Sequence, residues 1–183
     1  MGLDISVYTN VKPYNGEMDG IYPIEGSSFI VNNDECFKDR ALPLEYEKSY
    51  QGNPNIRYSF RAGSYGSYGQ WRETIAKYSG YPLAEYKKYN GEIVNSYAAG
   101  AWESNGGIFL ELINFSDCEG VLGSIVCKKL ANDFEYNMKD IFKKVSSDYP
   151  HDVRYISYFK ELYKNWMYAC KRAAKNSGVI RLA

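Results

Sequence analysis

The sequence has little of what marks several common classes of protein. It has no excess of one charge, since 22 Lys and Arg residues balance 22 Asp and Glu residues, so no overall field draws the chain onto nucleic acid or anionic lipid. No apolar run is long enough to cross a bilayer, and residues 1–11 alternate polar and apolar residues instead of forming the apolar core of a secretory signal. We therefore expect a cytoplasmic protein that binds neither nucleic acid nor membrane.

Histidine and cysteine are also scarce. His151 is the only histidine, and it follows Pro150 at a predicted helix start, where we expect an exposed side chain. No Gly-x-Ser-x-Gly, His-Glu-x-x-His or Cys-x-x-Cys motif occurs, so we assign no catalytic residue, cofactor or metal ligand. The four cysteines are predicted to be reduced core thiols, three of them on apolar helix faces: Cys36, Cys118, Cys127 and Cys170.

Tyrosine, in contrast, is abundant, with 19 residues in a chain of 183. This length fits one domain around a single core, and the tyrosines suit either that core or a contact surface with a second copy or a host protein. Predicted strands come first and helices mostly later, without regular alternation. The sequence therefore predicts a single α+β domain over residues 1–183, with an antiparallel or mixed sheet backed by three to four helices.

Alternation and turn residues place the elements along the chain. Strands are predicted where polar and apolar residues alternate, or where an apolar run is bounded by turns: 3–11, 28–31, 56–61, 95–103, 108–115 as a central strand, and 179–182. A glycine turn is expected at 105–107. Helices are predicted by capping residues followed by apolar residues at helical spacing: 67–80 with Ser67 and Gln70 as a capping box, 116–134, 136–145, and 148–178.

Several short segments resemble a family of uncharacterised proteins in phage and bacterial genomes. The segments are Met1-Gly2-Leu3-Asp4-Ile5, Phe60-Arg61-Ala62-Gly63-Ser64-Tyr65, Trp71-Arg72 and Leu112-Ile113-Asn114-Phe115-Ser116-Asp117-Cys118-Glu119-Gly120. The resemblance covers most of the chain and implies a cytoplasmic protein encoded by a phage or prophage. It implies no activity and no functional residue. The first six residues also fit a myristoylation pattern, although a buried first strand is the interpretation that we favour.

The first candidate site is the glycine-rich segment between a predicted strand and a predicted helix. Free backbone N–H groups at such a helix start form a cradle for an anion. Its alternative is a capped turn in which the glycines serve only geometry. In the binding model, backbone amides and serines hold the anion, arginines neutralise it, and aromatic rings cover a planar ligand: Ser64, Ser67, Arg61, Arg72, Tyr65, Tyr68 and Trp71.

The second candidate site lies at the end of the predicted central strand. It contains acidic and amide side chains: Glu111, Asn114, Ser116, Asp117 and Glu119. Helix capping explains most of them, but Glu111 is a carboxylate on an apolar strand face and needs a partner. We predict Arg61 as that partner, in a structural pair or in a pair that contacts ligand.

These patterns favour a non-enzymatic binding protein for a small, anionic, nucleotide-like ligand held between the two segments. One alternative is a metal-dependent hydrolase or transferase that acts on a phosphorylated compound, with Glu111 or Asp117 as base or metal ligand. Another is a protein-binding inhibitor of a host factor that uses exposed tyrosines. The basic residues between Lys160 and Lys175 are interpreted as a solvated helix face.

Overall fold

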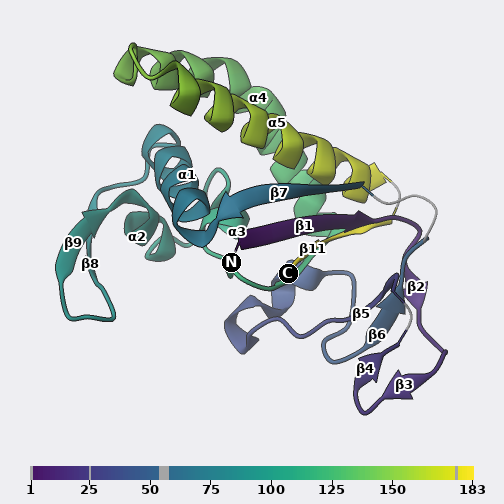
Figure 1. Cartoon of the computed structure of the whole chain (residues 1–183). Coiled ribbons are helices and arrows are strands. Elements are labelled where there is room, and N and C mark those ends of the chain that lie inside the picture. The colour runs from purple at the N-terminus through teal and green to yellow at the C-terminus, as the bar shows by residue number, and fades with distance from the viewer. Residues whose placement is uncertain (1, 25, 54–57, 176) are drawn as a thin grey trace.

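The centre of the protein is a four-stranded antiparallel sheet with the strand order β10-β11-β1-β7 (Figure 1). The structure is a computed structural model that describes residues 2–24, 26–53, 58–175 and 177–183. The sheet is formed by β1 (Gly2–Tyr8), β7 (Tyr58–Ser64), β10 (Gly120–Gly123) and β11 (Val179–Leu182). It confirms the predicted α+β class, and three of its four strands fall in or overlap predicted strand segments. Residues 56 and 57 of the predicted second strand lie outside the described residues.

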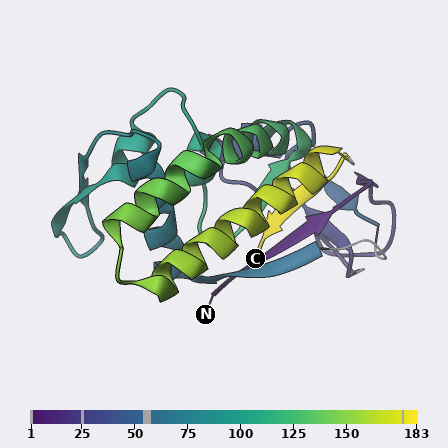
Figure 2. The same ribbon diagram turned by 90° about the horizontal axis from the view of Figure 1, so that it is seen from above.

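One face of the sheet is covered by two long helices, α4 (Ser124–Asp148) and α5 (Val153–Lys175). The helices lie side by side across the sheet (Figures 1 and 2). Alternation along β1 turns Leu3, Ile5 and Val7 into the core that these helices share with the sheet. Strand β11 contributes Ile180 and Leu182 to the same core. The sheet and both helices therefore have one continuous apolar interior.

Helix α1 (Tyr65–Tyr78) adds the aromatic part of this core. The indole rings of Trp71 and Trp166 stack with their centroids 6.5 Å apart, and the Tyr68 ring stacks on both. Trp71, Ile75 and Tyr78 are buried, as their spacing predicted. Most of the tyrosines that the sequence left open between core and contact surface are at least half-buried in the described part of the chain.

The opposite face of the sheet is only partly covered. A small sheet of order β2-β6-β5 lies on this side, together with the 3-10 helix η1 (Figure 1). Buried residues from these elements and from the main sheet form a second, smaller cluster: Tyr8, Phe29, Val31, Ala41, Tyr50, Val121 and Val179. The elements are β2 (Lys12–Pro13), β5 (Ser28–Ile30), β6 (Ser49–Gln51) and η1 (Glu35–Ala41).

Strand β10 lies at an edge of the main sheet, where a side chain occupies its free hydrogen-bonding groups. The Nδ2 of Asn33 donates to the carbonyl of Val121 at 2.9 Å, and its Oδ1 accepts from the amide of Val121 at 2.7 Å. The buried amide of Asn33 thus takes the place of a neighbouring strand and ends the sheet.

Two short hairpins and two short helices complete the described fold: β3 (Met18–Asp19) with β4 (Tyr22–Pro23), β8 (Ala84–Lys87) with β9 (Ile93–Ser96), α2 (Tyr97–Trp102) and α3 (Leu110–Ile113). The predicted strand 95–103 is therefore mostly helical. The turn predicted at 105–107 does not join two strands. No helix in the described part of the chain is long and apolar enough to cross a membrane.

The central strand predicted at 108–115 is wrong. Phe109 has left-handed backbone angles (φ 59°, ψ 12°), which break any extended run, and the short helix α3 follows it. Tertiary contacts hold this conformation, since the Phe109 ring packs on Phe134 and its amide donates to Asp133 Oδ2 at 2.8 Å. The apolar residues of this segment are buried from a turn and a helix, a pattern that alternation alone cannot distinguish from a buried strand.

The helix start predicted at Ser116 is also wrong. Residues 116–119 form a turn, Gly120–Gly123 forms β10, and helix α4 begins only at Ser124. The helix then runs without a break through both segments predicted as separate helices. Val121 and Leu122, predicted on a helix, are buried in β10, while Ile125 is exposed.

The thiol prediction is correct for half of the cysteines. Cys127 and Cys170 are buried in the main core, where burial raises the pKa of the Cys170 thiol. Cys36 and Cys118 are exposed, because both lie outside the helices α4 and α5.

Candidate functional site

The glycine-rich segment does not leave an open anion cradle. Helix α1 begins at Tyr65, two residues earlier than predicted, and Ser64 is its N-cap. The Ser64 Oγ accepts from the Ser67 amide at 3.1 Å and lies 2.8 Å from the Ser67 hydroxyl. The chain's own serines therefore occupy the helix start, as in the alternative of a capped turn.

The aromatic residues of this segment are not available to cover a ligand. Tyr68 and Trp71 are fully buried, and the Trp71 Nε1 donates to the carbonyl of Phe159. Tyr65 is half-buried against the same core. The two most prominent rings of the predicted pocket are thus parts of the interior.

Arg72 does bring the two predicted segments together, but it fills the space between them. Its Nη1 donates to the carbonyl of Phe115 at 2.7 Å, and its Nη2 lies 3.5 Å from the Asp117 carboxylate. Arg72 as a whole is 8% exposed, and its guanidinium lies over the Tyr68 ring at 4.8 Å. Arg72 therefore joins helix α1 to the 113–117 segment as a structural contact.

The predicted pair of Arg61 with Glu111 is not formed. Arg61 lies beside Asp4 on the outer face of the sheet, with Nη1 3.3 Å from Oδ1. The Glu111 carboxylate instead meets Lys129 at 2.6 Å, and the same ammonium lies 2.8 Å from Asp133. The misplaced strand explains the error, because Glu111 lies on α3 next to helix α4 and not on the main sheet.

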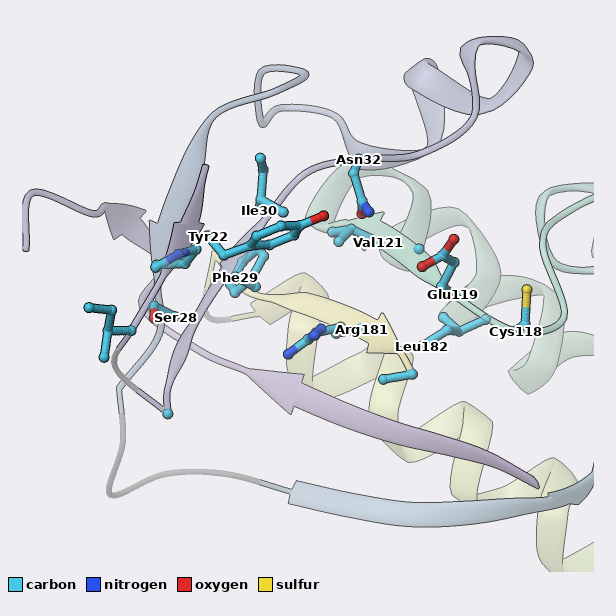
Figure 3. Close-up of a pocket in the computed structure, with 15 residues that line it drawn as sticks. Tyr22, Ser28, Phe29, Ile30, Asn32, Cys118, Glu119, Val121, Arg181 and Leu182 are labelled. Atoms are coloured by element: carbon cyan, nitrogen blue, oxygen red, sulfur yellow. The ribbon is translucent and has the colours of Figure 1, made fainter. Parts of the chain in front are cut away.

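The remaining residues of the second segment form a turn. The Ser116 Oγ accepts from the amide of Glu119 at 3.1 Å, so this serine stabilises the turn before β10. Asn114 is half-buried and is the C-cap residue of α3. The turn directs the Cys118 and Glu119 side chains toward a hollow that the sequence did not predict (Figure 3).

This hollow has a volume of about 500 Å³ and lies on the outer face of the sheet, between β10 and β11 on one side and residues 22–24 and 26–32 on the other (Figure 3). Such a volume suits a small organic ligand. Its lining combines an apolar wall with polar groups at the rim: Tyr22, Pro23, Ile24, Gly26, Ser28, Phe29, Ile30, Asn32, Cys118, Glu119, Gly120, Val121, Arg181, Leu182 and Ala183.

Arg181 is placed in this hollow by the alternation of β11. Ile180 and Leu182 face the helices, so Arg181 extends from the opposite face, where its Cα partners are Ser6 on β1 and Val121 on β10. The residue is half-buried. Among the described residues, its guanidinium has no hydrogen-bond or ion-pair partner. It is therefore a cation held in a concave surface and free to bind an anion.

Glu119 is the other charged side chain among the described residues of the lining. In the described part of the chain, its carboxylate pairs neither with Arg181 nor with any other cation. The labelled side chains of Tyr22, Asn32, Glu119 and Arg181 surround the hollow in Figure 3. Among the described residues, no group of three or more His, Cys, Asp or Glu side chains could hold a metal ion, here or elsewhere.

Comparison of the chain with family models, with curated proteins and with solved structures found no match.

Sequence reasoning missed Arg181, although a signal was present. The last predicted strand, Val179-Ile180-Arg181-Leu182, has one charged residue among apolar ones. Such a residue must face away from the core. The sequence does not show that residues 22–24 and 26–32, which are distant in the chain, lie around Arg181.

Proposed function

We propose that the protein binds a small anionic ligand, and that Arg181 holds the anionic group. The observation that carries this proposal is the unpaired, half-buried guanidinium in a hollow of about 500 Å³. A planar guanidinium presents two parallel N–H donors to a carboxylate or phosphate. The partly enclosed position also lowers the local dielectric constant and strengthens this contact compared with open water.

The ligand class agrees with the one expected from the sequence, but the site differs. Binding between the Gly63–Gly69 segment and residues 114–119 is not proposed, because Ser64 and Arg72 fill that region. The volume of the hollow is compatible with a ligand up to about the size of a mononucleotide, and the exposed Tyr22 ring offers an aromatic surface for a base. A cytoplasmic location remains part of this proposal.

Titration calorimetry with inorganic phosphate, acetate and a panel of mononucleotides tests the proposal. We expect at least one of these probes to bind the wild type, and Arg181→Ala to weaken that binding at least tenfold through loss of a charge-assisted hydrogen-bond pair. Arg154→Ala is the matched control, because Arg154 is exposed on helix α5 and no described residue of α5 lines the hollow. Binding that Arg181→Ala leaves unchanged would contradict the proposal.

A further inference from the structure

We infer that the ligand is a zwitterion, with its anionic group on Arg181 and a protonated amine on Glu119. The inference rests on the proposed function and narrows its ligand class. Its basis is the presence of two unpaired, opposite charges in one hollow.

The turn before β10 fixes where Glu119 lies. Its amide is bound to Ser116 Oγ at 3.1 Å, and the next residue but one, Val121, is the Cα partner of Arg181. Glu119, in the turn before β10, and Arg181, on β11, therefore line the same hollow (Figure 3). One molecule that fills this hollow can contact both side chains.

The two charged side chains of the described lining favour a zwitterion over a simple anion. Arg181 and Glu119 carry opposite charges. A ligand with only negative groups gains attraction at Arg181 and meets repulsion from Glu119. A ligand that also carries an ammonium group gains attraction at both positions.

The rest of the lining predicts what the ligand carries in addition to its two charges. The described lining also contains apolar side chains, among them Phe29 and Val121 together with Ile24 and Ile30. These residues can bury an aliphatic side chain. The site therefore fits an amino acid with an aliphatic side chain, or a phosphorylated amine with the same arrangement of charges.

Three probes with one carbon skeleton separate the contributions. L-leucine carries both charges, 4-methylpentanoate lacks the ammonium group, and 3-methylbutylamine lacks the carboxylate. With the full-length wild type, we expect L-leucine to bind about tenfold more tightly than 4-methylpentanoate. This factor is at the low end for a hydrogen bond to a charged group, because Glu119 is exposed and water screens its charge. O-phosphoethanolamine compared with ethyl phosphate tests the phosphate form in the same way.

Isosteric variants test the assignment of each charge. Glu119→Gln should abolish the preference for L-leucine and leave 4-methylpentanoate binding equal or stronger, while Arg181→Ala should weaken both. Glu161→Gln, an exposed carboxylate on helix α5 whose residues do not line the hollow, is the matched control. Each variant is checked for an unchanged unfolding midpoint.

The outcomes separate this inference from the proposed function. Arg181-dependent binding of phosphate or 4-methylpentanoate, with no preference for a zwitterion of either kind or with a preference that Glu119→Gln leaves intact, overturns the inference and keeps the proposed function. Absence of any Arg181-dependent binding overturns both.

Discussion

At the scale of single residues, the polar groups of the protein fall into three situations. The Arg72 guanidinium and the Asn33 amide are buried and bonded to backbone groups. The Tyr68 hydroxyl and the Trp166 Nε1 are buried with no hydrogen-bond partner among the described residues. Arg181 differs from all four, because it is half-buried and unpaired at the surface of a hollow. A polar group in the core that has no hydrogen-bond partner lowers the stability of the folded protein. At the surface of a hollow, a ligand can supply the missing hydrogen-bond partner.

The unpaired hydroxyl of Tyr68 gives a prediction for stability. Burial raises the pKa of this hydroxyl, so it stays neutral, and it has no partner to offset its lost hydration. Tyr68→Phe should leave the free energy of unfolding unchanged or raise it by about 1 kcal/mol. Urea denaturation followed by circular dichroism measures this difference.

Tyr163→Phe is the matched control, because its equally buried hydroxyl donates to the carbonyl of Phe134 at 2.8 Å. This change should lower the free energy of unfolding by about 1 kcal/mol. Equal destabilisation by both substitutions would mean that the Tyr68 hydroxyl has a partner in solution.

Asp148 gives a prediction for the dependence of stability on pH. Hydrogen bonds lower the pKa of this carboxyl below its ordinary value of 3.8. The bond from Lys77 has the largest effect, and the bond from Tyr78 comes second. The unfolded chain therefore takes up a proton at higher pH than the folded protein. The stabilisation is complete above about pH 4 to 5 and is lost as the pH falls through the folded-state pKa.

Asp148→Asn should make the unfolding midpoint in urea less sensitive to pH between pH 5 and pH 2, because the variant has no proton to take up at this site. Asp19→Asn, at an exposed residue of β3 without a bonded side chain among the described residues, serves as control and should keep the wild-type acid dependence. If the unfolding midpoint depended on pH in the same way in the wild type and in Asp148→Asn, the hydrogen bonds of Asp148 would not contribute to the acid dependence of stability.

At the scale of elements, the sequence predicts segments whose period alone decides their structure. The alternation of β1, the capped start and apolar face of α1, and the long period of α5 are all found in the structure. Segment 108–123 is different. Its apolar residues are buried through a left-handed Phe109, a single turn of helix and a short strand. These features depend on contacts with Asp133 and Asn33, which are distant in the sequence.

The candidate site follows the same division. The charge of Arg181 and its direction away from the core can be predicted from the four residues of β11. The hollow around Arg181 cannot be predicted from those four residues. Its walls come from three parts of the chain: residues 22–24 and 26–32, residues 118–121, and the last strand. The rejected site failed for the converse reason, since the local capping signals at Ser64 and Ser116 were present but served the chain itself.

The hydrogen bonds between Asn33 and the edge of β10 give a prediction at the scale of elements. Asn33→Ala leaves the amide and the carbonyl of buried Val121 without partners, and also removes a 3.1 Å bond to the carbonyl of Phe37. We expect the free energy of unfolding to fall by about 3 kcal/mol. Chemical denaturation measures the change.

Asn32→Ala is the adjacent control. Asn32 is exposed, and its side chain makes no hydrogen bond to any described residue, so the variant should stay within about 0.5 kcal/mol of the wild type. If Asn33→Ala were equally mild, another group would have to satisfy the edge of β10.

At the scale of the whole molecule, the main sheet has two different faces. The face that α4 and α5 cover (Figure 1) is an apolar interior, while the other carries Asp4, Ser6, Arg61 and Arg181 beside the smaller cluster. Arg61 is already paired with Asp4 there. The helices therefore cover one face, and the proposed binding site with Arg181 lies on the other.

The most direct measurement is the NMR signal of the Arg181 Nε–Hε group during titration with phosphate, assigned by its disappearance in Arg181→Lys. If Arg181 holds the anionic group, this signal shifts and saturates, together with backbone amides of β10 and β11, while the Nε–Hε signals of Arg72 and Arg154 stay in place. An Arg181 signal that does not move for phosphate, L-leucine or any mononucleotide would contradict this role of Arg181.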